Sequence, residues 1–477
     1  MNQKCDASTR RPILAPGLSP FQSLAKCLST AFGMRHIAAF LRVGLGCNRK
    51  TELSMKKVND IVRKLGPGLI TGAADDDPSG IATYSQAGSQ FRFGLVWTLL
   101  LTTPLMIGIQ MLSARIGWVT GEGLSANIAK ICPRWLTLNL IVLLVVANTI
   151  NIAADLGAMG EAVRLLAGGN VAPYIIGFGI ISIACQVYFS YERTVRILKW
   201  LTLALFSYVA VILSVSVPWK QVIAESALPW RYIPQGISMH DYASIVVAVL
   251  GTTISPYLFF WQAAQEVEDN IRRPEAAELH AHPAYAAEHL LRIKQDTYIG
   301  MLFSNGIALC IVLATAITLN EHGITNILTA TQAAEALRPI AGNFAFAIFA
   351  FGIIGTGLLA IPVLAGSAAF AVSEVFGWKA GLSHGFHEAQ GFYTIIIIAT
   401  VMGTIMGLLE IDPIKALVWS AIINGVISVP IMVVMMRIGQ SERIMGKLTI
   451  SRRHRIFGWA ATGVMALAVV FMLATNF

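Results

Sequence analysis

Apolar residues occur along this chain in long runs, not in the short alternating stretches of a soluble core. Eleven of these runs are long enough to cross roughly 30 Å of hydrocarbon as an α-helix. We expect the spans near residues 66–91, 95–117, 135–163, 172–190, 195–217, 242–265, 295–319, 343–375, 392–409, 413–436 and 456–475. The pattern predicts an all-α polytopic membrane protein with about eleven transmembrane helices.

Two of the runs are interrupted in the middle by proline. The first contains Asp77-Pro78, and the sixth contains Ser255-Pro256. Proline removes a backbone donor, so each helix should unwind there, and unwound backbone inside a membrane must line a cavity or be buried in protein. The first and sixth spans hold corresponding places in two five-helix halves. Paired interruptions of this kind point to a transport site made of discontinuous helices.

The polar groups expected around these breaks are all oxygen donors. Three successive aspartates end at Asp77, and carboxylates at membrane depth need a cation or water beside them. The Asp77 carboxylate, the Ser255 hydroxyl and the carbonyls of Ala74 and Thr252 would form a shell that suits hard cations such as Mg²⁺ or Mn²⁺, with Asp76 adding charge. The alternative interpretation is a kinked structural helix with a solvated acidic loop.

Composition and charge agree with a membrane location. Hydrophobic residues make up 55% of the 477-residue chain and charged residues 13%, and the mean hydropathy is +0.65. The six cysteines have no paired spacing, which argues against a disulfide framework or a zinc site. With the N-terminus in the cytoplasm, 29 of the 35 Lys and Arg lie on the cytoplasmic side. The net charge of +9 therefore reflects orientation in the inner membrane, with the C-terminus outside, and not nucleic-acid binding.

The chain divides into four parts. Residues 1–60 form a basic extension that we expect to be disordered or surface-bound, and Met34 and Met55 are alternative starts, so residues 1–54 need not belong to the native protein. The first repeat covers 61–220 and the second covers 240–437. A cytoplasmic loop and the last helix occupy 438–477.

The interrupted spans occur together with GPG at 66–68, QAGSQF at 86–91 and SARIGWVTG at 113–121. From about residue 60 to the C-terminus, the chain resembles the Nramp family of divalent-metal transporters. The resemblance implies a LeuT-like fold of two inverted five-helix repeats, with metal bound between unwound segments of helices 1 and 6. On that pattern, Asp77 corresponds to the metal-binding aspartate, and Ala74 and Thr252 correspond to carbonyl ligands.

Three positions depart from the family pattern. Gly80 replaces an asparagine, and Ser255 and Tyr257 replace a methionine and a histidine. A thioether favours softer transition metals, so its loss moves the expectation toward a harder and wetter ion. The combination resembles the divergent branch of Nramp-related magnesium transporters. The choice between Mg²⁺ and Mn²⁺ or Fe²⁺ stays open.

Proton coupling is expected to be weak or absent. Asp155 keeps the family's aspartate in helix 3, but Ala158 stands where the pattern has a second acid. Asp155 is either a relay residue or a polar group paired with a neighbouring helix. Asn424 and Asn305 are candidates for supporting the site or for an interhelical hydrogen bond.

Other functions remain as alternatives. A proton-coupled Mn²⁺/Fe²⁺ importer is the nearest, and a sodium-coupled carrier of organic solutes shares the architecture. A protease using Asp77 with Asp155 and a passive channel are less consistent with paired broken helices. We expect no enzyme activity and no cofactor, with the metal ion as substrate and the lipid bilayer as partner. The oligomeric state is not determined by the sequence.

Overall fold

A computed structural model describes residues 71–72, 74–188, 202–228, 233, 236–272, 283–327, 329–409 and 412–475. These residues all belong to one compact unit, Gly66–Phe477. The extension expected at 1–60 lies outside the described residues. The regular structure of the described part is helical, as the hydrophobic pattern predicted.

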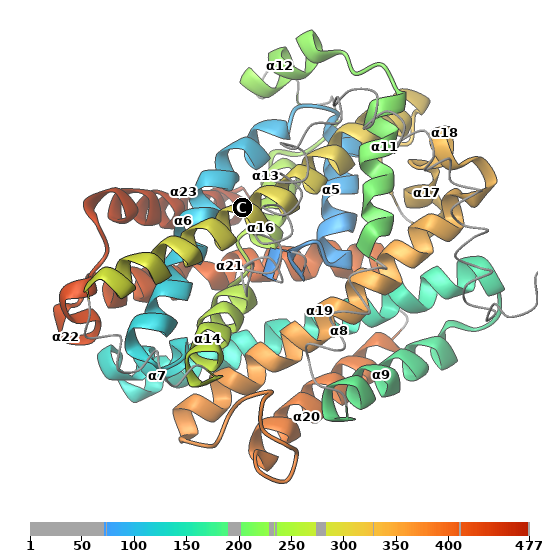
Figure 1. Ribbon diagram of the computed structural model, residues 1–477. Helices are drawn as coiled ribbons and strands as arrows, with labels where there is room; N and C mark the ends of the chain where they lie inside the picture. Colours follow the sequence, from blue (N-terminus) through green and yellow to red (C-terminus); the bar gives the residue numbers. More distant parts are fainter. Residues whose placement is uncertain are drawn as a thin grey trace, which may run out of the picture. The chain divides into compact units, whose positions relative to one another are not determined.

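The helices of the first half follow the expected order (Figure 1). They are α5 (Pro78–Phe91), α6 (Val96–Thr120), α7 (Leu124–Ile131), α8 (Arg134–Ala167), α9 (Val171–Tyr188), η1 (Thr202–Leu205), α11 (Phe206–Ser214) and α12 (Trp219–Ala227).

The second half repeats the pattern with longer connections. Its helices are α13 (Met239–Thr253), α14 (Pro256–Arg272), α16 (Pro283–Thr318), η3 (Asn320–His322), α17 (Ala330–Glu335), α18 (Arg338–Ala341), η4 (Gly342–Phe344), α19 (Ala345–Phe376), α20 (Gln390–Gly407), α21 (Pro413–Gln440), α22 (Glu442–Met445), η5 (Gly446–Leu448) and α23 (Arg452–Ala474).

Both predicted helix breaks are confirmed. Residues 74–75 are helical, the helix stops at Asp76, and α5 starts at Pro78 with extended Asp77 as its N-cap. Proline is favoured at the first helical position because the amide hydrogen it lacks has no partner there. In the sixth span, α13 ends at Thr253 and α14 begins at Pro256.

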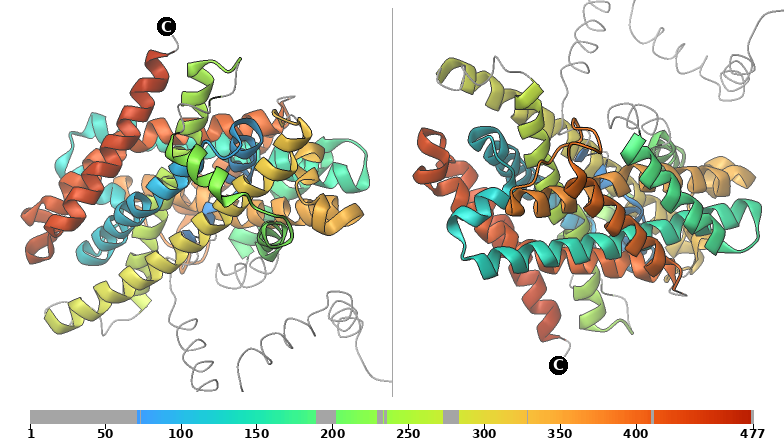
Figure 2. Two further views of the ribbon diagram at one scale, coloured as in Figure 1. Left: turned by 90° about the horizontal axis from the view of Figure 1, so that it is seen from above. Right: turned by 90° about the horizontal axis from the view of Figure 1, so that it is seen from below.

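Counterpart helices of the two halves pack in pairs. α5 contacts α13, α6 contacts α16, α8 contacts α19, and α9 contacts α20. We call α5, α6, α13, α14 and α16 the first helix group, and α8, α9, α19 and α20 the second helix group. Helices α8 and α19 run side by side, with α9 and α20 beside them (Figures 1 and 2). Helix α21 packs against α13, α5 and α8, so it joins the two groups.

The expected count of eleven spans is not confirmed by helix length and hydropathy. Within the described residues, nine helices are long and apolar enough to cross a membrane, or ten if Leu203–Ser214 and Trp219–Ala227, bent by 109°, form one span. The first expected span is shortened by its own break, since α5 has 14 residues. The fifth begins among residues that the structure does not describe.

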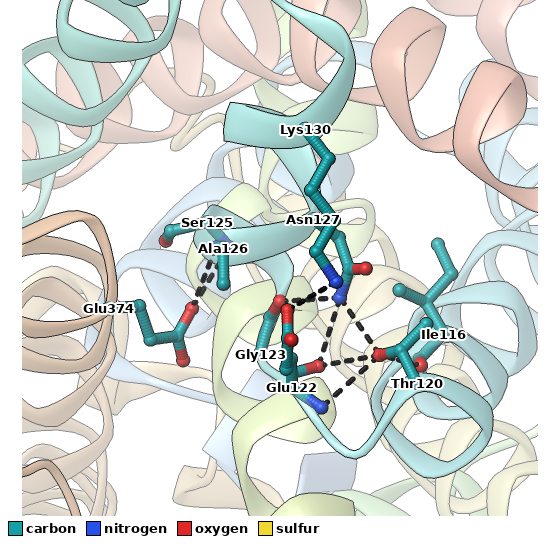
Figure 3. Close-up of polar contacts among 9 residues, drawn as sticks. All are labelled: Ile116, Thr120, Glu122, Gly123, Ser125, Ala126, Asn127, Lys130 and Glu374. Carbon is teal, nitrogen blue, oxygen red and sulfur yellow. Dashed lines mark hydrogen bonds and ion pairs between the residues drawn. The ribbon is translucent and has the colours of Figure 1, made fainter. Parts of the chain in front are cut away.

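A cluster of polar contacts fixes the short helix α7 between the two groups (Figure 3). Glu374 of α19 accepts hydrogen bonds from the backbone amides of Ser125 and Ala126, at 3.0 and 3.4 Å. A carboxylate there satisfies open amides at a helix N-terminus and complements the helix dipole. A Cβ at Gly123 would collide with the Glu374 carboxylate, which would have to move away from the α7 amides. Helix α7 is thereby attached to α19.

Candidate metal site

Asp77 lies at the meeting point of both broken helices, with 1% of its surface exposed. One carboxylate oxygen, Oδ1, accepts from the Ser79 hydroxyl at 2.6 Å and from the Gly80 amide at 2.7 Å. The other, Oδ2, accepts from Asn151 Nδ2 at 3.0 Å and from the Tyr257 hydroxyl at 3.2 Å. A carboxylate has about four acceptor positions, so a cation binding here must displace at least one of these donors.

Tyr257 connects the two breaks directly. Its hydroxyl, on α14, lies 3.2 Å from Asp77 Oδ2 and 3.4 Å from the carbonyl oxygen of Ala74. Those two oxygens are expected ligands. The hydroxyl therefore bridges two groups that a bound cation would also bridge. Tyr257 is buried, with 1% of its surface exposed. Tyr257 therefore contacts two of the expected ligands directly.

Ser255 forms its hydrogen bonds within its own span, and one of its partners is the Thr252 carbonyl. The Ser255 hydroxyl donates to the carbonyls of Gly251 and Thr252, at 2.9 and 2.8 Å. It thus satisfies carbonyls left open where α13 ends. The Thr252 side chain faces α5. A Cβ added to Gly80 of α5 would lie only 3.2 Å from Thr252 Oγ1. The two broken ends are close, and Gly80 leaves little room for a larger side chain.

Asp75 and Asp76 share one donor on the neighbouring helix α16. The Ser304 hydroxyl lies 2.6 Å from Asp75 Oδ2 and 3.2 Å from Asp76 Oδ1. Their other carboxylate oxygens, Asp75 Oδ1 and Asp76 Oδ2, are buried without a hydrogen-bond partner in the described part of the chain. One hydroxyl cannot offset the desolvation of two carboxylates, which are costly to bury unpaired. The arrangement favours positive charge near the break.

Helices α8 and α21 bring two further polar residues that the sequence singled out. Asp155 is fully buried one turn after Asn151 on α8, and neither of its carboxylate oxygens has a hydrogen-bond partner among the described residues. Asn424 on α21 is 1% exposed, and its amide is likewise unpartnered within the described ranges. Asn305, by contrast, donates to Thr103 Oγ1 at 3.1 Å and so links α16 to α6.

The donor set limits the chemistry of the site. Among the residues that the structure describes, no three His, Cys, Asp or Glu side chains are grouped so that they could hold a metal ion by themselves. A cation at Asp77 therefore needs backbone carbonyls, hydroxyls or water to complete its shell. Such an oxygen shell suits hard cations that keep part of their hydration.

Two cavities lie beside α8, and the first of them also borders α5. The first, about 130 Å³, is lined by Ile81 and Ser85 of α5 and by Ala158 of α8, among others. The second, about 740 Å³, lies between α8, α9, α20 and α21. Glu161 and Arg164, an ion pair with 2.6 Å between carboxylate and guanidinium, line both. Ala158 thus borders open space at the position where the family pattern has an acid.

Two polar residues that contact the aspartates were not predicted from the sequence. Asn151 donates to Asp77, and Ser304 donates to Asp75 and Asp76. A signal existed for Asn151, which stands one helical turn from Asp155 in an apolar span. Ser304 had no such signal, because serine is common in membrane helices and its partners are more than 200 residues away in sequence.

Comparison with known proteins supports the interpretation of the fold. The family model "Natural resistance-associated macrophage protein-like", or Nramp, matches residues 68–475. The crystal structure of a manganese transporter from Eremococcus coleocola, in complex with an aromatic bis-isothiourea substituted compound, superposes with a TM-score of 0.66 at 15% identity. The match covers 86% of this chain and 85% of that one, which confirms the predicted fold class.

Related sequences cover nearly the same length. A divalent metal cation transporter MntH from Clostridium acetobutylicum is 22% identical over 450 residues, covering 90% of this chain and 95% of the relative. A protein of the same name from Deinococcus radiodurans is 25% identical over 436 residues, covering 87% and 90%.

Proposed function

The chain belongs to the Nramp family, and we propose that it moves divalent metal cations, Mg²⁺ and/or Mn²⁺ with Fe²⁺ as a further candidate, across the inner membrane by alternating access. Membership makes it a multi-pass membrane transporter. The proposal adds that the preferred ion is hard and hydrated, and that its transport is coupled weakly or not at all to protons.

The observation that carries the proposal is the position of Asp77. It is a buried carboxylate between two interrupted helices, and donors reach it from α8 and α14. Intramembrane carboxylates of this kind mark ion pathways, and paired discontinuous helices are typical of alternating-access carriers. The names of the two sequence relatives, both divalent metal cation transporters, support the same class of substrate.

The chemistry of the donors supports a hard ion. The Tyr257 hydroxyl contacts both the Asp77 carboxylate and the Ala74 carbonyl, and Ser255 occupies the position of the family's methionine. Oxygen ligands suit Mg²⁺ and Mn²⁺, whereas a thioether favours softer metals. We assign Asp77, Ala74, Thr252, Ser255 and Asp76 to the metal site on this ground.

One observation favours the alternative, a proton-coupled importer of Mn²⁺ or Fe²⁺. Asp155 keeps a buried carboxylate that has no hydrogen-bond partner in the described residues, and such a group is able to exchange a proton. Against it, Ala158 and Tyr257 replace two ionisable groups of the family pattern. Weak coupling therefore agrees better with the residues present.

The test of the site is divalent-cation uptake into proteoliposomes containing the purified chain. Asp77→Ala is expected to lower uptake by more than about tenfold, because losing a charged ligand costs more than the roughly 1.4 kcal/mol that this factor represents. Asp241→Ala is the matched control, since Asp241 lies exposed in the first turn of α13. Equal uptake by the two variants would remove Asp77 from the site.

The test of ion preference uses the same vesicles. Mg²⁺ in excess is expected to compete with Mn²⁺ uptake, because an oxygen shell discriminates weakly between the two ions. A pH-sensitive dye inside the vesicles should record little acidification during uptake. Mn²⁺ uptake that resists excess Mg²⁺ and acidifies the interior would establish the proton-coupled alternative instead.

A further inference from the structure

A separate cavity lies away from the metal site, between α6, α16 and α23. Its volume is about 240 Å³. Its apolar wall includes Met111 and Leu112 of α6 and Leu290 and Leu291 of α16. Helix α6 packs against both α16 and α23, and the three helices lie side by side in the left view of Figure 2.

Three basic side chains line this cavity, one from each helix. They are Arg115 of α6, Lys294 of α16 and His454 of α23, and no carboxylate is among the lining residues that the structure describes. Arg115 is fixed in place, because its Nε and Nη2 donate to the carbonyls of Leu448 and Thr449, each at 3.1 Å. Arg115 and Lys294 therefore give the cavity positive charge, with no carboxylate among its described lining residues to compensate it.

The helices around the cavity expose apolar side chains next to it. Leu291 of α16 is 52% exposed, and Ile456 and Phe457 of α23 are 60% and 48% exposed. Arg452, Arg453 and Arg455 are also exposed at the start of α23. Exposed apolar side chains next to a helix end rich in arginine are expected where a helix enters the membrane from the cytoplasm.

We propose that this cavity binds the phosphate head group of one anionic phospholipid. Lys294 and Arg115 would contact the phosphate, and the acyl chains would lie along Met111 and Leu112 of α6 and the exposed Ile456 and Phe457 of α23. Basic pockets between transmembrane helices on the cytoplasmic side recognise this chemistry, whereas a zwitterionic head group lacks net charge to match it. The bound lipid would join α23 to the first helix group. This proposal does not depend on the transported ion.

The test is native mass spectrometry of the full chain in detergent, titrated with phosphatidylglycerol or phosphatidylcholine. One phosphatidylglycerol should stay bound at concentrations where phosphatidylcholine does not. Lys294→Gln should raise the Kd for phosphatidylglycerol by about fivefold, which is the effect of one basic residue near the membrane surface. Lys294→Arg should retain binding, and this second variant also guards against an effect of altered folding.

Lys379→Gln is the matched control, because Lys379 is exposed between α19 and α20 and does not line the cavity. Equal binding of the two lipids, or equal losses in Lys294→Gln and Lys379→Gln, would overturn the proposal. A further arm adds inorganic phosphate at millimolar concentration. If phosphate alone displaces the lipid and binds in a Lys294-dependent way, the cavity is a free-anion site and not a lipid site.

Discussion

The Tyr257 hydroxyl lies between the Ala74 carbonyl and the Asp77 carboxylate, both of which we assign to the cation. A hydroxyl there either competes with the incoming ion or joins its shell. It donates to Asp77 in this conformation, and a donor hydrogen points at the position where a cation would bind. We therefore infer that the cation must displace this hydrogen bond.

The variant Tyr257→Phe tests that inference. Removing a competing hydrogen bond with a net value of about 1 kcal/mol should lower KM for the divalent cation by about fivefold. The measurement is the concentration dependence of Mn²⁺ or Mg²⁺ uptake in vesicles.

Tyr393→Phe serves as the control for Tyr257→Phe. Tyr393, near the start of α20, is also buried, but its hydroxyl donates to the carbonyl of His384 at 2.9 Å. KM in this variant should stay near that of the unchanged chain. A raised KM in Tyr257→Phe would mean instead that the hydroxyl is itself a ligand.

Individual residues of the site were predictable to different degrees. Asp77 was recognisable because an acid followed by proline inside an apolar run has few structural explanations. The bonds from Asn151 to Asp77 and from Ser304 to Asp75 were not predictable, because they depend on how distant helices are rotated against one another. The sequence also could not show that Ser255 turns back to the carbonyls of its own helix.

At the level of elements, the broken sixth span is held by a close approach of two backbones. A Cβ on Gly251 of α13 would meet backbone atoms of Ala421 and Gly425 of α21. Backbone cannot move aside as a flexible side chain can. Glycine at 251 therefore allows α13 to lie against α21 just before the break.

Gly251→Ala should therefore destabilise the protein. Forcing extra volume into a packed contact costs about 1–3 kcal/mol, so the variant should unfold at a lower temperature in detergent and transport more slowly. Gly306→Ala on α16 is the control, because nothing lies within 4 Å of a Cβ there. If the two variants unfold at the same temperature, the packing of α13 on α21 does not hold the break.

The long helices and their breaks were predicted from the sequence more readily than the short helices and bends that connect them. Both breaks occur at the predicted prolines, because proline acts locally on its own helix. The short helix α7 and the sharp bend between α11 and α12 were not foreseen. They depend on tertiary contacts, such as the Glu374 carboxylate on α7, that no local pattern records.

At the scale of the whole molecule, the distribution of basic residues predicts the orientation in the membrane. Reporter fusions to alkaline phosphatase test it, because the enzyme is active only outside the cytoplasm. A fusion after residue 440, before α23, should be inactive, whereas a fusion at the C-terminus should be active. The reverse result would place the N-terminus outside and would reverse the side from which each cavity opens.

The sequence predicted a fold of two repeats, but it did not predict which helices of the two repeats contact each other. Equal helix counts in the two halves and a break in each first helix indicated the repeat. That α21 packs against helices of both groups became visible only in three dimensions.

The attachment of α7 to α19 would limit the movement of helices in the proposed alternating access. Helix α6 belongs to the first helix group, whereas Glu374 ties α7 to the second, and only residues 121–123 connect α6 to α7. Three extended residues span at most about 10 Å. This three-residue connection therefore limits how far α6 and α7 can move apart. If the end of α6 near Thr120 and the end of α19 near Glu374 separate by more than this connection allows, the hydrogen bonds from α7 to Glu374 must break before the ion is released.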